Sequence, residues 1–271
     1  SPVTQTDNLP TDLTALVDRY SQLLKSGRYN RCVIEICTSK TSLIGQPITE
    51  SKGCLTVRIT EEHDFRGDGY KLALTTAILA CKILGGHNVL LWFSTPCTGG
   101  TAWTHVNLAK ARRDNKQKTI DKIMAHRKLH KELFERVMML CEAVSSYNPG
   151  IAVEWPLRCI YWRTTSVRKL CNQYNLLFYT VAGCMIGVTS KETKYSGKPV
   201  QKQWRIATNR PMVGVTMASK CDGSHEHAPC QGITTKATEL YTPMFAKLLH
   251  IGWKRSTAVY AAQTSNSDSA K

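Results

Sequence analysis

The chain has no long apolar run. None of its hydrophobic stretches approaches about 18 residues without a charged side chain, which is the length a membrane-spanning helix requires, so a transmembrane helix is excluded. Acidic residues are also scarce: 20 Asp and Glu stand against 36 Lys and Arg, for a formal net charge of +16. An excess of this sign attracts polyanions. It therefore indicates nucleic acid or an anionic membrane surface as the partner, with a basic protein of scattered charge as the alternative. Of these partners we expect nucleic acid and no membrane.

The eleven cysteines do not form the pattern of a disulfide framework. Their number is odd and most of them lie inside apolar runs, which predicts a reducing compartment, nuclear or cytoplasmic. No signal peptide is visible, and the sequence opens with Ser1-Pro2 rather than Met. We therefore expect an intracellular protein that is a processed or trimmed piece of a longer chain.

Short apolar strand patterns alternate with amphipathic helical patterns along the chain. Hydrophobic periodicity predicts helices at 11–24, 70–84, 117–146 and 166–174, and strands at 32–37, 54–60, 88–93, 151–154, 176–181, 185–188 and 204–208. This order indicates an α/β fold, a Rossmann-like and mostly parallel sheet with helices on both faces. We expect one domain over 11–260 with a small Cys/His segment at 220–232, a flexible N-terminus at 1–10 and a disordered tail at 261–271.

Polar residues follow the predicted strands, and ligand sites of such sheets lie at the carboxyl ends of the strands. The loop after the first strand lacks the G-x-G-x-x-G pattern of dinucleotide-binding proteins. It offers small and polar side chains instead, and acids follow the second strand, where they can accept hydrogen bonds from ribose hydroxyls. The candidate cofactor-binding residues are Glu35, Thr38, Ser39, Ser42, Glu61, Asp64, Ser94 and Pro96.

Two further strand ends carry reactive groups. Ser94-Thr-Pro-Cys97 follows the central apolar strand, and Val153-Glu-Trp-Pro156 follows the next. Together they resemble the class I S-adenosylmethionine-dependent methyltransferases, most nearly the cytosine-C5 enzymes. The resemblance implies that Cys97 is the thiolate that adds to C6 of a pyrimidine and that Glu154 is the partner of its N3 edge. It also implies that the segment 241–249 is the helix that packs against the cofactor loop.

The residues alone leave three roles open for Cys97: catalytic nucleophile, pocket lining, or a buried core cysteine. Thr95-Pro96 precedes Cys97 where the cytosine-C5 family has two prolines, and Trp155 follows Glu154 where that family has Asn. A second resemblance, to an uncharacterised region of retroelement- or virus-type polyproteins, rests on the Glu35-Ile-Cys-Thr-Ser39 loop, Pro96-Cys-Thr-Gly-Gly100, Glu154-Trp-Pro156 and the Cys/His segment near the C-terminus. That similarity implies no activity, but it is compatible with a separate polyprotein-derived partner.

A second group of reactive residues lies near the C-terminus. Cys221, His225, His227 and Cys230 fall within ten residues and offer the two thiolates and two imidazoles that tetrahedral Zn²⁺ accepts. The spacing C-x3-H-x-H-x2-C differs from that of standard zinc fingers. Structural zinc, a polar loop without metal, and a catalytic histidine all remain open.

Basic and aromatic residues form the candidate nucleic-acid surface, by phosphate contact and base stacking. They are Lys116, Lys118, Lys122, Arg127, Lys128, Arg158, Trp162 and Arg163. Two alternatives remain open: Trp162 is buried by an amphipathic helix, and the lysine-rich helix start at 116–131 is only a solvated face.

The sequence thus predicts a methyltransferase that acts on nucleic acid, with bound S-adenosylmethionine and structural zinc. The alternatives are a non-catalytic nucleic-acid-binding protein on a degenerate methyltransferase scaffold, and a Cys-dependent hydrolase that uses His225 or His227.

Overall fold

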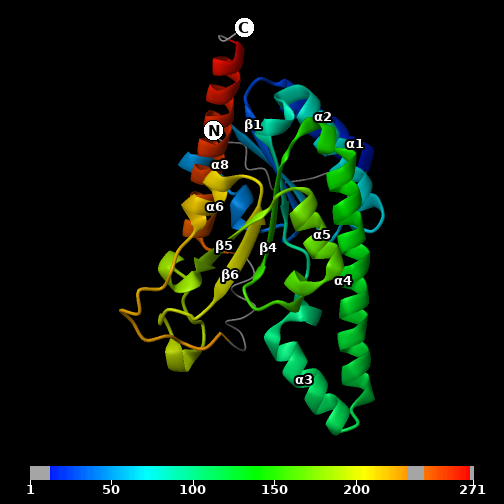
Figure 1. Cartoon of the computed structure of the whole chain (residues 1–271), viewed down its shortest axis with the longest axis vertical. Helices are drawn as coiled ribbons and strands as arrows, with labels where there is room; N and C mark the ends of the chain where they lie inside the picture. Colours follow the sequence, from blue (N-terminus) through cyan, green and yellow to red (C-terminus); the bar gives the residue numbers. More distant parts are fainter. Residues whose placement is uncertain (1–12, 231–240, 269–271) are drawn as a thin grey trace.

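A computed structural model describes residues 13–230 and 241–268 (Figure 1). Its centre is a six-stranded sheet in the order β2-β1-β3-β4-β6-β5. The strands are β1 (Arg31–Thr38), β2 (Cys54–Thr60), β3 (Val89–Phe93), β4 (Gly150–Pro156), β5 (Leu177–Ala182) and β6 (Gln203–Thr208). Strands β2, β1, β3 and β4 run parallel, whereas β6 is antiparallel to both β4 and β5. The predicted α/β fold, with a mixed and mostly parallel sheet, is confirmed.

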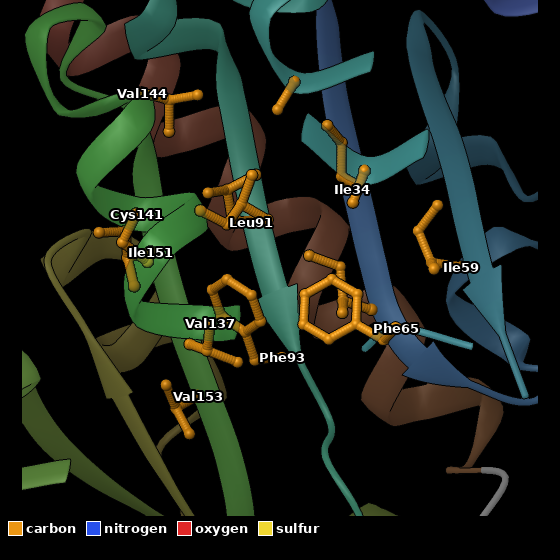
Figure 2. Close-up of a cluster of buried hydrophobic side chains, with 14 of the residues drawn as sticks. Ile34, Ile59, Phe65, Leu91, Phe93, Val137, Cys141, Val144, Ile151 and Val153 are labelled. Carbon is orange, nitrogen blue, oxygen red and sulfur yellow. The ribbon is translucent and has the colours of Figure 1, made fainter. Parts of the chain in front are cut away.

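The parallel strands are buried on both sides, which explains their nearly continuous apolar sequences. One face is covered by α1 (Leu13–Lys25), α2 (Asp68–Leu84), α4 (Gln117–Ala143) and α5 (Thr165–Gln173). Figure 2 shows Val137 and Cys141 of α4, and Val144 directly after it, on the same side as Leu91 of β3 and Ile151 of β4. The predicted helices at 117–146 and 166–174 lie within a few residues of these bounds.

The other face is covered by α6 (Pro211–Met217) and the C-terminal helix α8 (Pro243–Asp268). Residues 39–53, which join β1 to β2, contain two 3₁₀ turns and no α-helix. Helix α8 packs against both turns and against α6, and His250 Nε2 lies 2.7 Å from the Ile44 carbonyl oxygen. The last helix of the chain therefore covers the part of the sheet that the β1–β2 connection leaves open.

One local prediction was wrong. The expected strand at 185–188 is a 3₁₀ turn, Gly183–Ile186, followed by Gly187 with φ of +84°, a conformation that ends a strand and favours glycine. Of the segment 261–271, expected to be a disordered tail, the part up to Asp268 belongs to α8, and 269–271 lie outside the described residues. Residues 253–268 contain neither Gly nor Pro, which would interrupt a helix. The predicted flexible segment 1–10 lies outside the described residues.

None of the helices in the described ranges is long and apolar enough to cross a membrane. All eleven cysteines are free thiols, in agreement with the prediction that the chain has no disulfide framework.

Candidate functional site at the carboxyl ends of the strands

Strand β1 lies between β2 and β3 in the sheet. After β1 the chain adds β2 on one side of it and then crosses to add β3 and β4 on the other side, so the strand order reverses between β1 and β3. Ligands of open α/β sheets bind at such a switch point. A pocket of about 1020 Å³ lies there, and its lining includes the last residues of β1, β2 and β4 and the residues that follow β1, β2 and β3. The predicted site residues in its lining are Thr38, Ser39, Glu61, Asp64, Ser94, Pro96, Cys97 and Glu154.

Glu154 is the most perturbed acid of the pocket. Its side chain is buried, and burial raises the pKa of the carboxyl group to about 7. The Tyr241 hydroxyl donates a hydrogen bond to Glu154 Oε2 at 2.7 Å and lies 2.6 Å from Ser94 Oγ. Trp92 Nε1 donates to the same hydroxyl at 3.2 Å. Glu154 therefore changes its charge near neutral pH in a fixed position.

The loop that carries Cys97 is held from two sides. Trp155 Nε1 donates to the Thr95 carbonyl oxygen at 2.8 Å, and Arg127 Nε donates to the Gly99 carbonyl oxygen at 3.1 Å. A Cβ on Gly99 would lie 2.5 Å from the Tyr161 hydroxyl, so this turn approaches its neighbour too closely for any larger residue. Cys97 thus sits on a positioned loop of the pocket wall.

The end of β1 has an unusual backbone. Cys37 has φ of +60°, in the left-handed region that non-glycine residues rarely adopt, and the β1–β2 register shifts there. Such outliers occur often at ligand sites. Burial raises the pKa of the Cys37 thiol to about 12, so it stays protonated at neutral pH.

Glu35 and Ser42 lie beneath the pocket rather than in its lining. The hydroxyls of Ser42 and Thr38 donate to Glu35 Oε1, and Arg58 Nε lies 3.9 Å from its Oε2. Desolvation still raises the pKa of the Glu35 carboxyl. This buried group braces the loop after β1, and only Thr38 and Ser39 of that loop face the pocket.

The acids after β2 differ in their partners. Asp64 forms an ion pair with Arg66, in which Arg66 Nε lies 2.9 Å from Asp64 Oδ1. Glu62 forms an ion pair with Lys40, in which Lys40 Nζ lies 2.9 Å from Glu62 Oε1. Glu61 is exposed in the pocket lining and makes no hydrogen bond or ion pair with another described residue. Glu61 is therefore the acid of this group that is best able to accept a ligand's hydroxyl groups.

Helix α3 (Ala102–Arg113) and the first half of α4 extend past the sheet as a two-helix arm (Figure 1). A groove of about 370 Å³ runs between the two helices, and Thr98 lines both this groove and the strand-end pocket. Residues 102–131 contain nine Lys and Arg against two Asp and no Glu. Trp103 of α3 is 67% exposed, although sequence reasoning did not single it out.

The predicted basic and aromatic residues divide between surface and interior. Those exposed to solvent are Lys116, Lys118, Lys122, Lys128, Arg158 and Arg163. Arg127 is half-buried and bonded to the Cys97 loop. The side chain of Trp162 is only 6% exposed, and its ring centroid lies 4.8 Å from that of Trp155. Its Nε1 donates a hydrogen bond to the Pro156 carbonyl oxygen. Its expected role in stacking on a base is therefore wrong, because its ring belongs to the core.

The Cys/His group differs from the prediction in one ligand. Cys221, His225 and His227 come together, but the fourth member is Cys184, from the 3₁₀ turn after β5. The candidate ligand atoms of these four residues all lie within 4.8 Å of one another, so the group could bind a metal such as zinc. The expectation for Cys230 is corrected: this residue packs against the hydrophobic cluster on the α8 side of the sheet instead.

Sequence reasoning missed Tyr241 and Cys184 as individual site residues. The sequence places Tyr241 only at the start of the segment 241–249, although its hydroxyl donates to Glu154, 87 positions away. Cys184 lies in the turn Gly183–Ile186 directly after β5, and nothing in the local sequence marks it as a metal ligand. Each of these residues is distant in sequence from the residues that it contacts, and only the folding of the chain brings them together.

In comparisons with known proteins, no family model, no curated protein and no solved structure matches the chain.

Proposed function

We propose that the protein is an S-adenosylmethionine-dependent methyltransferase that acts on a pyrimidine base of nucleic acid. The observation that carries the proposal is that one pocket, at the β1/β3 switch point, is lined by both Cys97 and Glu154, and that the pKa of Glu154 is raised to about 7. The strand order supports it, since the pocket lies where the order of the parallel strands reverses, the place at which open α/β sheets bind their ligands.

The pocket has groups suited to a nucleoside cofactor. Glu61 is available to accept hydrogen bonds from ribose hydroxyls, and Thr38 and Ser39 present small polar side chains beside it. S-Adenosylmethionine supplies an electrophilic methyl group when it is bound. The volume of about 1020 Å³ is large enough for a nucleoside and a second ring.

In this proposal Cys97 and Glu154 act on the target base. The Cys97 sulfur adds to C6 of the pyrimidine, which makes C5 nucleophilic. Glu154 is protonated in about half of the molecules at pH 7, given its pKa of about 7. Its proton can therefore be donated to N3, where negative charge develops during the addition. A base within a duplex would have to leave the stack to reach this pocket.

The arm of α3 and α4 supplies the polymer contacts. Its groove opens at Thr98 beside the pocket and is lined by Lys110, Lys116 and Lys122. Phosphates bound along this groove would hold the strand that flanks the target base. The exposed ring of Trp103 offers a surface on which a neighbouring base can stack.

The test is methyl transfer from labelled S-adenosylmethionine to DNA and RNA, with calorimetric titration of the cofactor on the same samples. We expect Cys97→Ser to abolish transfer and to leave cofactor affinity unchanged. The matched control is Cys171→Ser, which changes a buried thiol of α5 outside the pocket lining and should retain most of the activity. An unchanged rate in Cys97→Ser would remove the nucleophile from the proposal.

The exposed basic arm also favours the second candidate, a nucleic-acid-binding protein without catalysis. In that case the wild-type protein would bind nucleic acid in a salt-dependent way and would show no affinity for S-adenosylmethionine. A Cys-dependent hydrolase is less well supported, because His225 and His227 face Cys221 and Cys184 rather than the pocket lining.

A further inference from the structure

The group of Cys184, Cys221, His225 and His227 lies outside the strand-end pocket and plays no part in the proposed reaction. Its ligand atoms are spaced as a tetrahedral metal would space them. With Zn–N of about 2.0–2.1 Å and Zn–S of about 2.3 Å, two nitrogens should be about 3.3 Å apart, and a sulfur and a nitrogen about 3.6 Å apart. The two Nε2 atoms lie 3.1 Å apart, and Cys221 Sγ lies 3.4 Å from His227 Nε2 and 3.8 Å from His225 Nε2.

The surroundings resemble those of a built metal site. The Gly223 backbone N–H points at Cys221 Sγ at 3.4 Å, as donors to a coordinated thiolate do. The Asp222 carboxylate accepts from the backbone N–H and hydroxyl of Ser224, which closes the turn between Cys221 and His225. Asp222 Oδ1 also lies 3.8 Å from Nδ1 of His225, the nitrogen on the far side of the ring from Cys221. An acid in this position favours the tautomer that leaves Nε2 free for a metal.

The segment 218–230 contains no helix or strand, and its only fully buried apolar side chain is Ala228. It nevertheless joins three separate parts of the fold. Ser219 Oγ accepts from the Ala182 N–H at the end of β5, Cys184 contributes from the turn that follows, and Ala228 forms a bridge with Val200. A segment with so little core needs another source of order.

The geometry points to a structural Zn²⁺ site formed by Cys184, Cys221, His225 and His227, which fastens the segment 218–230 to the β5–β6 edge of the sheet. Both thiols lose their protons on binding, and both imidazoles bind in the neutral form through Nε2. The bound metal also fixes the chain from Val200 to Trp204, because Gln201 N–H donates to the Ala228 carbonyl oxygen at 3.2 Å. Lys202 and Trp204 of that stretch line the strand-end pocket, so the metal supports one wall of it from outside.

The first experiment measures the metal content of the full chain after purification without chelators and exhaustive dialysis. We expect one equivalent of zinc in the wild type. Cys184→Ser and Cys221→Ser should lose it, whereas Cys230→Ser, the matched control, should retain it. Retention in Cys184→Ser together with loss in Cys230→Ser would overturn the ligand assignment, and a zinc-free wild type that also fails to bind added zinc would overturn the site.

Because a cysteine variant can fail to fold, the wild type is also examined with Co²⁺ in place of zinc. Two thiolates and two imidazoles in a tetrahedron predict intense visible d–d bands and a sulfur-to-cobalt charge-transfer band in the near ultraviolet. Weak bands typical of octahedral coordination, or no charge-transfer band, would contradict the proposed ligand set.

Hydrogen exchange before and after chelation tests the structural role. We expect faster exchange in 218–230 and 199–204, and unchanged exchange in β1 and β3. Uniform exchange across the molecule, with zinc shown to be bound and then removed, would refute the claim that the metal fastens this edge. None of these measurements involves methyl transfer or nucleic acid, so their outcome is independent of the proposed function.

Discussion

At the scale of single residues, the pocket depends on how burial changes Glu154. An isolated glutamate has a pKa of 4.5, whereas burial raises the pKa of Glu154 to about 7 despite the hydrogen bond from Tyr241. A carboxyl group with this pKa can exchange a proton at neutral pH, as a general acid or base must. Burial at the end of β4 therefore determines the proton chemistry of Glu154.

The shift at Glu154 makes stability depend on pH. Between pH 4.5 and about 7 the folded chain holds a proton on Glu154 that the unfolded chain has released. This contribution to the free energy of unfolding is therefore fully present below pH 4.5 and is lost as the pH rises to about 7. Its full size is about 3 kcal/mol. In Glu154→Gln this dependence should disappear, because the amide does not titrate.

The measurement is urea unfolding of the wild type and Glu154→Gln between pH 4.5 and 8. The free-energy difference between the two proteins should shift by up to about 3 kcal/mol in favour of the variant as the pH rises. Glu135→Gln, at an exposed position of α4, is the control and should show no such shift. A pH-independent difference for Glu154→Gln would mean that this carboxyl group has an ordinary pKa.

At the scale of elements, the strands and the longer helices could be predicted from local pattern. The buried strands are short apolar runs, and α4 shows helical periodicity over most of its length, so each carries its own signal. The antiparallel insertion of β6, the bond between Tyr241 and Glu154, and the approach of Cys184 to Cys221 carry no such signal. They arise from packing between segments that are distant in sequence, and the candidate site was incomplete for that reason.

Helix α8 packs closely against α6 at one residue, Gly252. A Cβ on Gly252 would lie 2.9 Å from the Met212 carbonyl oxygen and from the Val213 Cα in α6. Alanine is a better helix former than glycine by about 1 kcal/mol, so helix propensity alone predicts that Gly252→Ala is stabilising. We expect the opposite, a loss of about 1–3 kcal/mol, because the added methyl group must push α6 and α8 apart.

Thermal and urea unfolding of Gly252→Ala test this prediction. The reference is Ala258→Gly, at an exposed position of the same helix, where only propensity acts and the expected loss is about 1 kcal/mol. A stabilised Gly252→Ala would show that the α6–α8 contact is loose and that α8 does not depend on a close approach there.

At the scale of the whole molecule, the excess of positive charge is unevenly distributed. Of the net +16, an excess of seven positive charges falls within residues 102–131, on the arm that extends from the carboxyl ends of the strands (Figure 1). The pocket and this charge thus lie on the same side of the sheet. A polyanion attracted by the protein's field would be drawn toward the pocket rather than to the opposite edge.

Replacing three lysines of the groove tests whether this distribution has a function. Each phosphate contact releases counterions, so the triple variant Lys110→Gln, Lys116→Gln, Lys122→Gln should weaken nucleic-acid binding and reduce the slope of log K against log salt by about 2–3. The control removes the same charge from the amino ends of the strands, in Lys25→Gln, Lys52→Gln, Lys82→Gln, all at exposed positions. Fluorescence anisotropy with a labelled oligonucleotide from low to moderate salt measures both effects. If the two triple variants lose affinity and slope equally, binding follows the total charge and the arm has no special part in it. If only the groove variant loses affinity and salt slope, the arm holds the nucleic-acid strand whose base enters the pocket.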